Sequence, residues 1–195
     1  MAGFFKRIWK RFKTPSARYG AGVLLAGGLV AGIALTVAFG AAYDYTNSTK
    51  FCLSCHSLQW AADEWRESSH YNEATGFRAE CQDCHVPDDF FWGMREKILS
   101  YRDVVGQIRG TIDTEEKFEE RRPLLAERVW SKLEATDSRE CRSCHMEEIW
   151  DLEEQSGRAR REHQDARETG ETCIECHRGV AHKYPKEEEE VDYGF

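Results

Sequence analysis

The sequence predicts a mainly α-helical protein with much irregular structure, in which one N-terminal membrane-spanning helix precedes a small compact domain. Three observations lead to this fold class. A run of 25 residues near the N-terminus carries no charged side chain. The rest of the chain is polar, with few strand-like alternations and only modest helical segments. All eight cysteines fall in four short motifs of one kind within this polar part.

The charge-free run extends from Tyr19 to Tyr43 and predicts a transmembrane helix over residues 19–43. At about 1.5 Å per residue, a helix of this length crosses a hydrocarbon core of about 30 Å. A cleavable signal peptide is the alternative, since the run ends in AFGAA. The apolar region of a signal peptide is usually only about 7–15 residues long, however, so we expect a retained anchor.

Charge predicts the topology of the chain. Residues 1–18 carry six basic side chains and no acidic one, which places them in the cytoplasm by the positive-inside rule. Residues 44–195 are then expected on the periplasmic side of the inner membrane. They hold 21 basic against 35 acidic side chains, a formal balance of −14. This surface argues against nucleic acid as a partner. It fits a basic docking patch on another protein, or acidity that only serves solubility.

Four C-x-x-C-H motifs indicate covalent haem attachment. They are CLSCH with Cys52, Cys55 and His56, CQDCH with Cys81, Cys84 and His85, CRSCH with Cys141, Cys144 and His145, and CIECH with Cys173, Cys176 and His177. Disulfides or two zinc sites would also use paired cysteines, but neither requires a histidine after each second cysteine. In haem attachment the two thiols bond the vinyl groups and the histidine is the proximal iron ligand. We expect four haem c groups to form most of the core of a domain at residues 44–185.

Three histidines remain once the four proximal ligands are counted: His70, His163 and His182. Four irons need four sixth ligands, so at least one iron takes a different ligand or none, unless a partner protein supplies the ligand. His70 and His163 lie in similar polar stretches between motifs, which predicts two duplicated two-haem units at about residues 50–87 and 139–182. We expect all three histidines to be distal ligands. Spacing does not indicate which haem each one serves, although His182 is expected to reach a neighbouring haem rather than its own.

The first motif follows the predicted anchor by a few residues, so the first haem is expected near the membrane surface and is the best candidate for an iron without a second histidine. Phe90, Phe91 and Trp92 form an aromatic cluster typical of membrane interfaces, although the same segment also suits an amphipathic helix packed on the haems. A substrate from the bilayer could approach the first haem. If that substrate is a quinol, its oxidation releases two protons with two electrons, which requires an acceptor base. Lys97 and Asp103 are the candidates, although their spacing does not place them on one helix face.

The chain resembles the NapC/NirT family of tetrahaem cytochromes c and the related NrfH group. The resemblance covers nearly the whole chain and includes the segments CQDCHVP, GTIDTEEKFEERR, DSRECRSCH and TCIECHRGVAHK. It implies a membrane-anchored quinol dehydrogenase that passes electrons through four haems to a periplasmic reductase or soluble cytochrome, in respiration of the nitrate or nitrite type. It also implies that His70, His163 and His182 are distal ligands, and that Lys97 and Asp103 lie near a quinol site beside the first haem.

One position departs from this family. Many relatives carry methionine two residues after the first motif histidine, sometimes as an axial ligand, whereas this chain has Leu58. A leucine side chain cannot bind iron, so His56 is the expected proximal ligand of the first haem, and its sixth ligand stays open.

Two other functions remain possible from the sequence. The same chain of haems could run in reverse, as a quinone reductase supplied by a periplasmic cytochrome. Alternatively, an open haem could reduce nitrite or a similar small oxidant directly, although no dedicated catalytic pocket is evident. The last segment, residues 186–195, is expected to be a solvated acidic tail.

Overall fold

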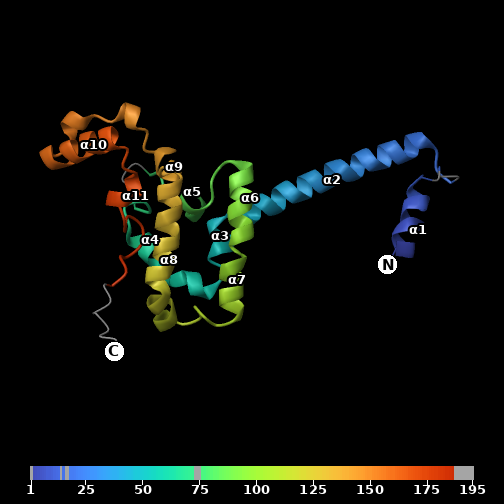
Figure 1. The fold of residues 1–195 in the computed structure, drawn as a ribbon, viewed down its shortest axis with the longest axis horizontal. Coiled ribbons are helices and arrows are strands. Elements are labelled where there is room, and N and C mark those ends of the chain that lie inside the picture. Colours follow the sequence, from blue (N-terminus) through green and yellow to red (C-terminus); the bar gives the residue numbers. More distant parts are fainter. Residues whose placement is uncertain (1, 14, 16–17, 73–75, 187–195) are drawn as a thin grey trace. The chain divides into compact units, whose positions relative to one another are not determined.

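The computed structural model describes residues 2–13, 15, 18–72 and 76–186, and the chain separates into two units, Met1–Thr46 and Asn47–Phe195. The described residues are mainly helical and contain no β-strand, which confirms the predicted fold class (Figure 1). The helices are α1 (Ala2–Lys13), α2 (Ala21–Asn47), α3 (Thr49–Cys52), α4 (Gln59–Glu67), α5 (Cys81–His85), α6 (Phe90–Leu99), α7 (Tyr101–Ile108), α8 (Glu115–Ala135), α9 (Arg139–Arg142), α10 (Gly157–Thr169) and α11 (Cys173–Cys176). Beyond Lys186, the predicted acidic tail lies outside the described residues.

Helix α2 is long and apolar enough to cross a membrane. It has 27 residues, and an 18-residue window within it has a mean hydropathy of 2.2; at about 1.5 Å per residue the helix measures about 40 Å. Its one polar side chain in the apolar stretch, Thr36, donates its hydroxyl to the carbonyl of Gly32 at 2.9 Å, so no hydroxyl is left unpaired in this part of the helix. The helix continues four residues beyond the predicted end at Tyr43.

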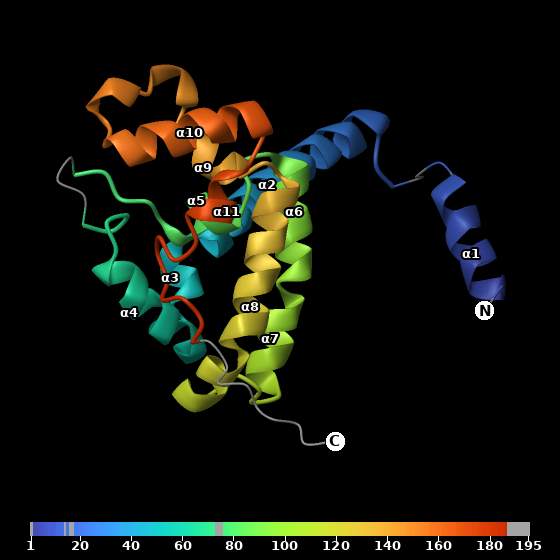
Figure 2. The ribbon, with the colours of Figure 1, turned by 60° about the vertical axis from the view of Figure 1, so that its left-hand side comes forward.

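Helix α8 is the longest helix of the second unit. Its N-terminus is capped by Thr114, whose hydroxyl oxygen accepts the N–H of Lys117 at 3.4 Å. In both views α8 runs alongside α6 and α7 (Figures 1 and 2). The ammonium of Lys132 on α8 lies 3.5 Å from the carboxylate of Glu96 on α6, which joins the two helices. Helix α8 also packs against α11, which carries the fourth cysteine motif.

The second and fourth cysteine motifs begin short helices because their sequences contain capping boxes. Glu80 precedes α5 and exchanges hydrogen bonds with Asp83, inside CQDCH. Thr172 precedes α11 and exchanges hydrogen bonds with Glu175, inside CIECH. The acidic residue between the two cysteines thus stabilises the turn that brings both thiols to one side.

The second unit has few buried apolar side chains among its described residues. They are Ala62, Trp65, Ile112, Phe118, Leu133 and Ile174. A domain of about 150 residues ordinarily buries most of the surface of its unfolded chain, and the hydrophobic effect grows with that area. Six buried apolar side chains are too few to form the core of a domain of this size. The apolar faces of bound haem groups would supply the missing part of the core.

Ser138 connects the third motif with the fourth. It is fully buried and adopts the left-handed backbone conformation, with φ of 46°. Its hydroxyl oxygen accepts the N–H of Ile174 at 3.1 Å, and Ile174 is itself buried. The second motif residue of α11 is therefore held against the N-terminus of α9.

We expect Ser138→Ala to lower the free energy of unfolding by about 1–3 kcal/mol, because it leaves the buried N–H of Ile174 without an acceptor. Denaturant unfolding of the haem-loaded chain, followed by visible circular dichroism, measures this. Ser131→Ala is the matched control, since Ser131 is exposed on α8 and bonds only a neighbouring side chain, that of Glu127. It should change stability by less than about 0.5 kcal/mol. Equal effects of the two changes would contradict the role of Ser138.

Candidate haem sites and an adjoining cavity

The four cysteine motifs lie next to one another in chain order. Helix α5, which carries the second motif, packs against α3 of the first motif and α9 of the third. The thiols of Cys52 and Cys81 are in hydrogen-bond contact. Burial and then the neighbouring thiol of Cys141 raise the pKa of Cys84 to about 11. With the Ser138–Ile174 contact, these observations describe a continuous row of four attachment points.

Each histidine outside the motifs faces a motif histidine. The ring centres are 6.2 Å apart for His70 and His145, 6.2 Å for His85 and His182, and 5.9 Å for His163 and His177. An imidazole nitrogen binds a first-row metal ion at about 2.0–2.1 Å, so two rings on opposite sides of one ion have centres roughly 6 Å apart. The three histidine pairs therefore fit three haem irons with an imidazole on each face.

The surroundings of these histidines favour the form that binds metal. Desolvation by the surrounding protein atoms lowers the pKa of His85 to about 4, although part of the residue is exposed, and the nearby His182 adds to the effect. Burial also lowers the pKa of His182. Both imidazoles are therefore neutral at pH 7, as a metal ligand must be. Nδ1 of His163 lies 2.6 Å from the side-chain amide oxygen of Gln155. If Nδ1 carries the proton, it donates to this oxygen and leaves Nε2 free to bind iron.

His56 of the first motif has a different environment. Its Nε2 lies 3.0 Å from the carbonyl oxygen of Asp113, and its Nδ1 lies 3.3 Å from the amide nitrogen of Gln107. Its neighbouring ring is that of Trp60, with centres 6.2 Å apart, and none of the described histidines faces it. One of these two hydrogen bonds must be released before His56 can bind iron as the sequence predicts.

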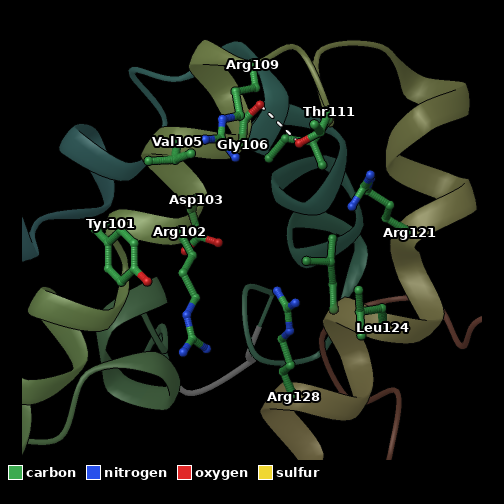
Figure 3. Close-up of a pocket in the computed structure, with 12 residues that line it drawn as sticks. Tyr101, Arg102, Asp103, Val105, Gly106, Arg109, Thr111, Arg121, Leu124 and Arg128 are labelled. Atoms are coloured by element: carbon green, nitrogen blue, oxygen red, sulfur yellow. Dashed lines mark hydrogen bonds between the residues drawn. The ribbon is translucent and has the colours of Figure 1, made fainter.

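A cavity of about 410 Å³ adjoins the residues that hold His56 (Figure 3). It lies between α7 and α8 and is partly open to solvent. Its lining comprises Tyr101, Arg102, Asp103, Val105, Gly106, Arg109, Thr111, Ile112, Arg121, Leu124, Leu125 and Arg128. Gly106 and Ile112, which line it, are the chain neighbours of Gln107 and Asp113, the two hydrogen-bond partners of His56. Four arginines and one carboxylate give it a positive balance in an otherwise acidic domain.

The two predicted proton-handling residues occupy different places. Asp103 lines the cavity, and Figure 3 shows it on the wall opposite Arg121 and Arg128. Asp103 keeps part of its surface exposed, and partial desolvation of its carboxylate raises its pKa, although Arg128 and Arg102 oppose the shift. Lys97 does not line the cavity. It lies near the thiol of Cys52, and partial burial lowers its pKa. The structure thus separates Lys97 from Asp103, as their spacing along the chain predicts.

Several residues that shape these sites had no recognisable signal in the sequence. Gln107 and the backbone of Asp113 hold His56, and Gln155 orients His163. Glutamine side chains and backbone carbonyls occur throughout any chain, so only the folded arrangement distinguishes these three. The arginines of the cavity are similar, because they come from α7, the residue that follows it and α8, and only the packing of these two consecutive helices brings them around one space.

Known cytochromes c resemble the chain over most of its length. The profile of the NapC/NirT cytochrome c family, N-terminal region, matches residues 14–187. The chain is 45% identical over 181 residues to the denitrification system component NirT of Stutzerimonas stutzeri, which covers 92% of this chain and 90% of that protein. It is 49% identical over 170 residues to a putative tetraheme cytochrome-c type protein of Allochromatium vinosum, covering 87% and 90%.

A third relative extends over almost all of the chain. The cytochrome c-type protein NapC of Escherichia coli K12 is 41% identical over 194 residues, which is 99% of this chain and 96% of that protein. No solved structure matches the chain significantly. The match to the family profile and the extent of these alignments show that the chain belongs to the NapC/NirT cytochrome c family, as an electron-transfer protein that carries haem c.

Proposed function

We propose that the chain oxidises quinol from the membrane and delivers the electrons, through four covalently bound haems, to a periplasmic reductase of nitrate or nitrite respiration. The observation that carries this proposal is the contrast between His56 and the other motif histidines. Three motif histidines face a second histidine at about the distance that one iron requires, whereas His56 faces none of the described histidines. The chain neighbours of its two hydrogen-bond partners line a cavity with an ionisable group. One haem position is thereby distinguished from three that only need to carry electrons.

Each haem is held by two cysteines and its motif histidine. We assign the distal ligands by the facing rings, so that His182 serves the haem of His85, His70 serves that of His145, and His163 serves that of His177. Haem c, when bound, supplies reversible one-electron oxidation and reduction. Imidazole on both faces favours the ferric state and gives low potentials, which suits electrons that originate from quinol.

Asp103 is the proposed acceptor for a quinol proton. Each quinol releases two electrons and two protons, so a base must take up a proton as each hydroxyl loses it. A carboxylate with a raised pKa is a stronger base than an aspartate with the ordinary pKa. Asp103 has a raised pKa, and it lines the cavity. Lys97 is the second ionisable candidate, because it lies beside the first haem attachment at Cys52.

The outer surface of α6 and α7 supports access from the lipid. Phe91 is 80% exposed, and Ile98, Tyr101 and Ile108 are also exposed in the second unit. An apolar and aromatic surface of this kind is typical of the membrane interface. Together with the anchor α2, it supports a single-pass arrangement at the cytoplasmic membrane with the haem domain in the periplasm.

The test is a count of iron spin states in the purified full chain, with and without a quinol analogue. We expect three low-spin haems and one high-spin or weakly ligated haem, and only the latter should respond to the analogue. Four low-spin haems with two imidazoles each would contradict the assignment, because only three histidines remain outside the motifs.

The same preparation separates the alternative functions. Reduction of the haems by a water-soluble quinol supports the proposed direction, and haems that are reduced only by a periplasmic cytochrome would favour the reverse one. Steady reduction of nitrite by the chain without any partner protein would indicate a terminal reductase instead.

A further inference from the structure

A buried ion pair lies beside the haem sites. Glu64 on α4 and Arg122 on α8 each have a side chain that is only 7% exposed. Oε1 of Glu64 accepts a hydrogen bond from Nη2 of Arg122 at 2.6 Å, and Oε2 accepts one from Nη1 at 2.9 Å. This two-bond geometry holds both side chains in one orientation. Because burying two charges costs free energy of solvation, stability alone is a weak explanation for the pair.

The same carboxylate holds the chain segment that carries His182. Oε2 of Glu64 accepts the N–H of Lys183 at 3.0 Å, and Nη1 of Arg122 donates to the carbonyl oxygen of Lys183 at 3.3 Å. Nδ1 of His182 lies 3.8 Å from Oε2 of Glu64. The backbone of Ala61, one turn before Glu64 on α4, also interacts with the imidazole of His182. The backbone next to His182 is thus held from α4 and α8, and the imidazole lies beside the Glu64 carboxylate without a direct hydrogen bond to it.

We propose that Glu64 is a positioning residue for His182, and that its carboxylate lowers the midpoint potential of the haem attached beside His85. This inference rests on the proposed role of His182 as the distal ligand of that haem. A carboxylate beside the outer nitrogen of a metal-bound imidazole fixes the ring and increases its basicity. A more basic axial ligand and a nearby negative charge both stabilise ferric iron, so both lower the potential.

Glu64→Gln separates charge from shape, because glutamine has almost the same size and keeps one oxygen acceptor. Arg122 would still be held by Glu119, whose carboxylate accepts from Nε of Arg122 at 2.8 Å. The positive charge of Arg122 would then lack its partner on α4. Loss of the Glu64 carboxylate leaves the guanidinium with one carboxylate partner in place of two, and both changes in charge act toward a higher potential.

The experiment is a redox titration of the haem-loaded full chain in detergent, combined with a count of low-spin haems. For Glu64→Gln we expect one of the four redox components to move to higher potential, while the other three and the spin states stay unchanged. Glu119→Gln is the matched control, because Glu119 bonds the same arginine but none of its hydrogen bonds reaches His182 or the Lys183 backbone. All four components of the control should keep their potentials.

Two further variants keep the outcome interpretable. His182→Ala should convert one low-spin haem to high-spin; if it does not, the assignment of His182 is wrong. If it does, but Glu64→Gln leaves every potential at its wild-type value, only the positioning role is wrong. Should Glu64→Gln fail to accumulate with four haems, Glu64→Asp retains the charge with a shorter reach. It should show a smaller shift of the same component, and no shift at all would overturn the inference.

Discussion

Replacement of Asp103 by asparagine should slow the reduction of the protein by quinol about 10²-fold or more, the usual contribution of a positioned general base. Asparagine has nearly the same shape but cannot accept the proton that the quinol hydroxyl loses. Rapid mixing of quinol with the oxidised full chain, followed in the haem absorption band, measures the rate. The number of low-spin haems should not change, which separates a lost base from a disturbed fold.

The pH profile gives a second readout of the same residue. Only the carboxylate form of Asp103 accepts a proton, so the wild-type rate should rise as pH increases through its pKa. Because partial desolvation raises the pKa of Asp103, this rise should occur at higher pH than it would for an aspartate with the ordinary pKa. Asp103→Asn should lack this part of the profile.

Glu127→Gln provides the matched control for Asp103. Glu127 is the chain neighbour of Arg128, is exposed, accepts a hydrogen bond from Ser131 and does not line the cavity. Its replacement should preserve both the rate and the pH profile. A wild-type rate and profile in Asp103→Asn would exclude Asp103 as the acceptor and would direct attention to Lys97.

The second large effect concerns the histidines outside the motifs. Each of His70→Ala, His163→Ala and His182→Ala should lower the number of low-spin haems from three to two, because each removes one of two axial imidazoles. Electron paramagnetic resonance together with near-infrared magnetic circular dichroism measures the count. Added imidazole should restore the third low-spin haem if it can enter the space that the alanine leaves.

The control for this series is Gln164→Ala, next to His163 on α10 with an exposed side chain. It should keep three low-spin haems. The three alanine variants should each affect a different redox component, because the facing rings belong to three different motifs. Two variants that affect the same component would contradict the pairing assigned here.

Much of this arrangement could be predicted from residue order, because it depends on neighbours along the chain. The C-x-x-C-H motifs place both thiols and the histidine within five residues, and α2 follows from an uninterrupted apolar run. The shortage of one histidine is also a property of the composition. The sequence names Lys97 and Asp103 as candidates whose spacing does not place them on one helix face, and of the two only Asp103 lines the cavity.

Other features required the folded chain, because they join residues that are distant in the sequence. His70 faces His145, and His182 faces His85, and no local pattern relates either pair. Helices α4 and α8 bring Glu64 and Arg122 to the segment that follows His182, and α7 with its connection to α8 brings Gln107 and Asp113 to His56. A motif specifies where a haem is attached, whereas the ligand on its other face depends on how the helices pack.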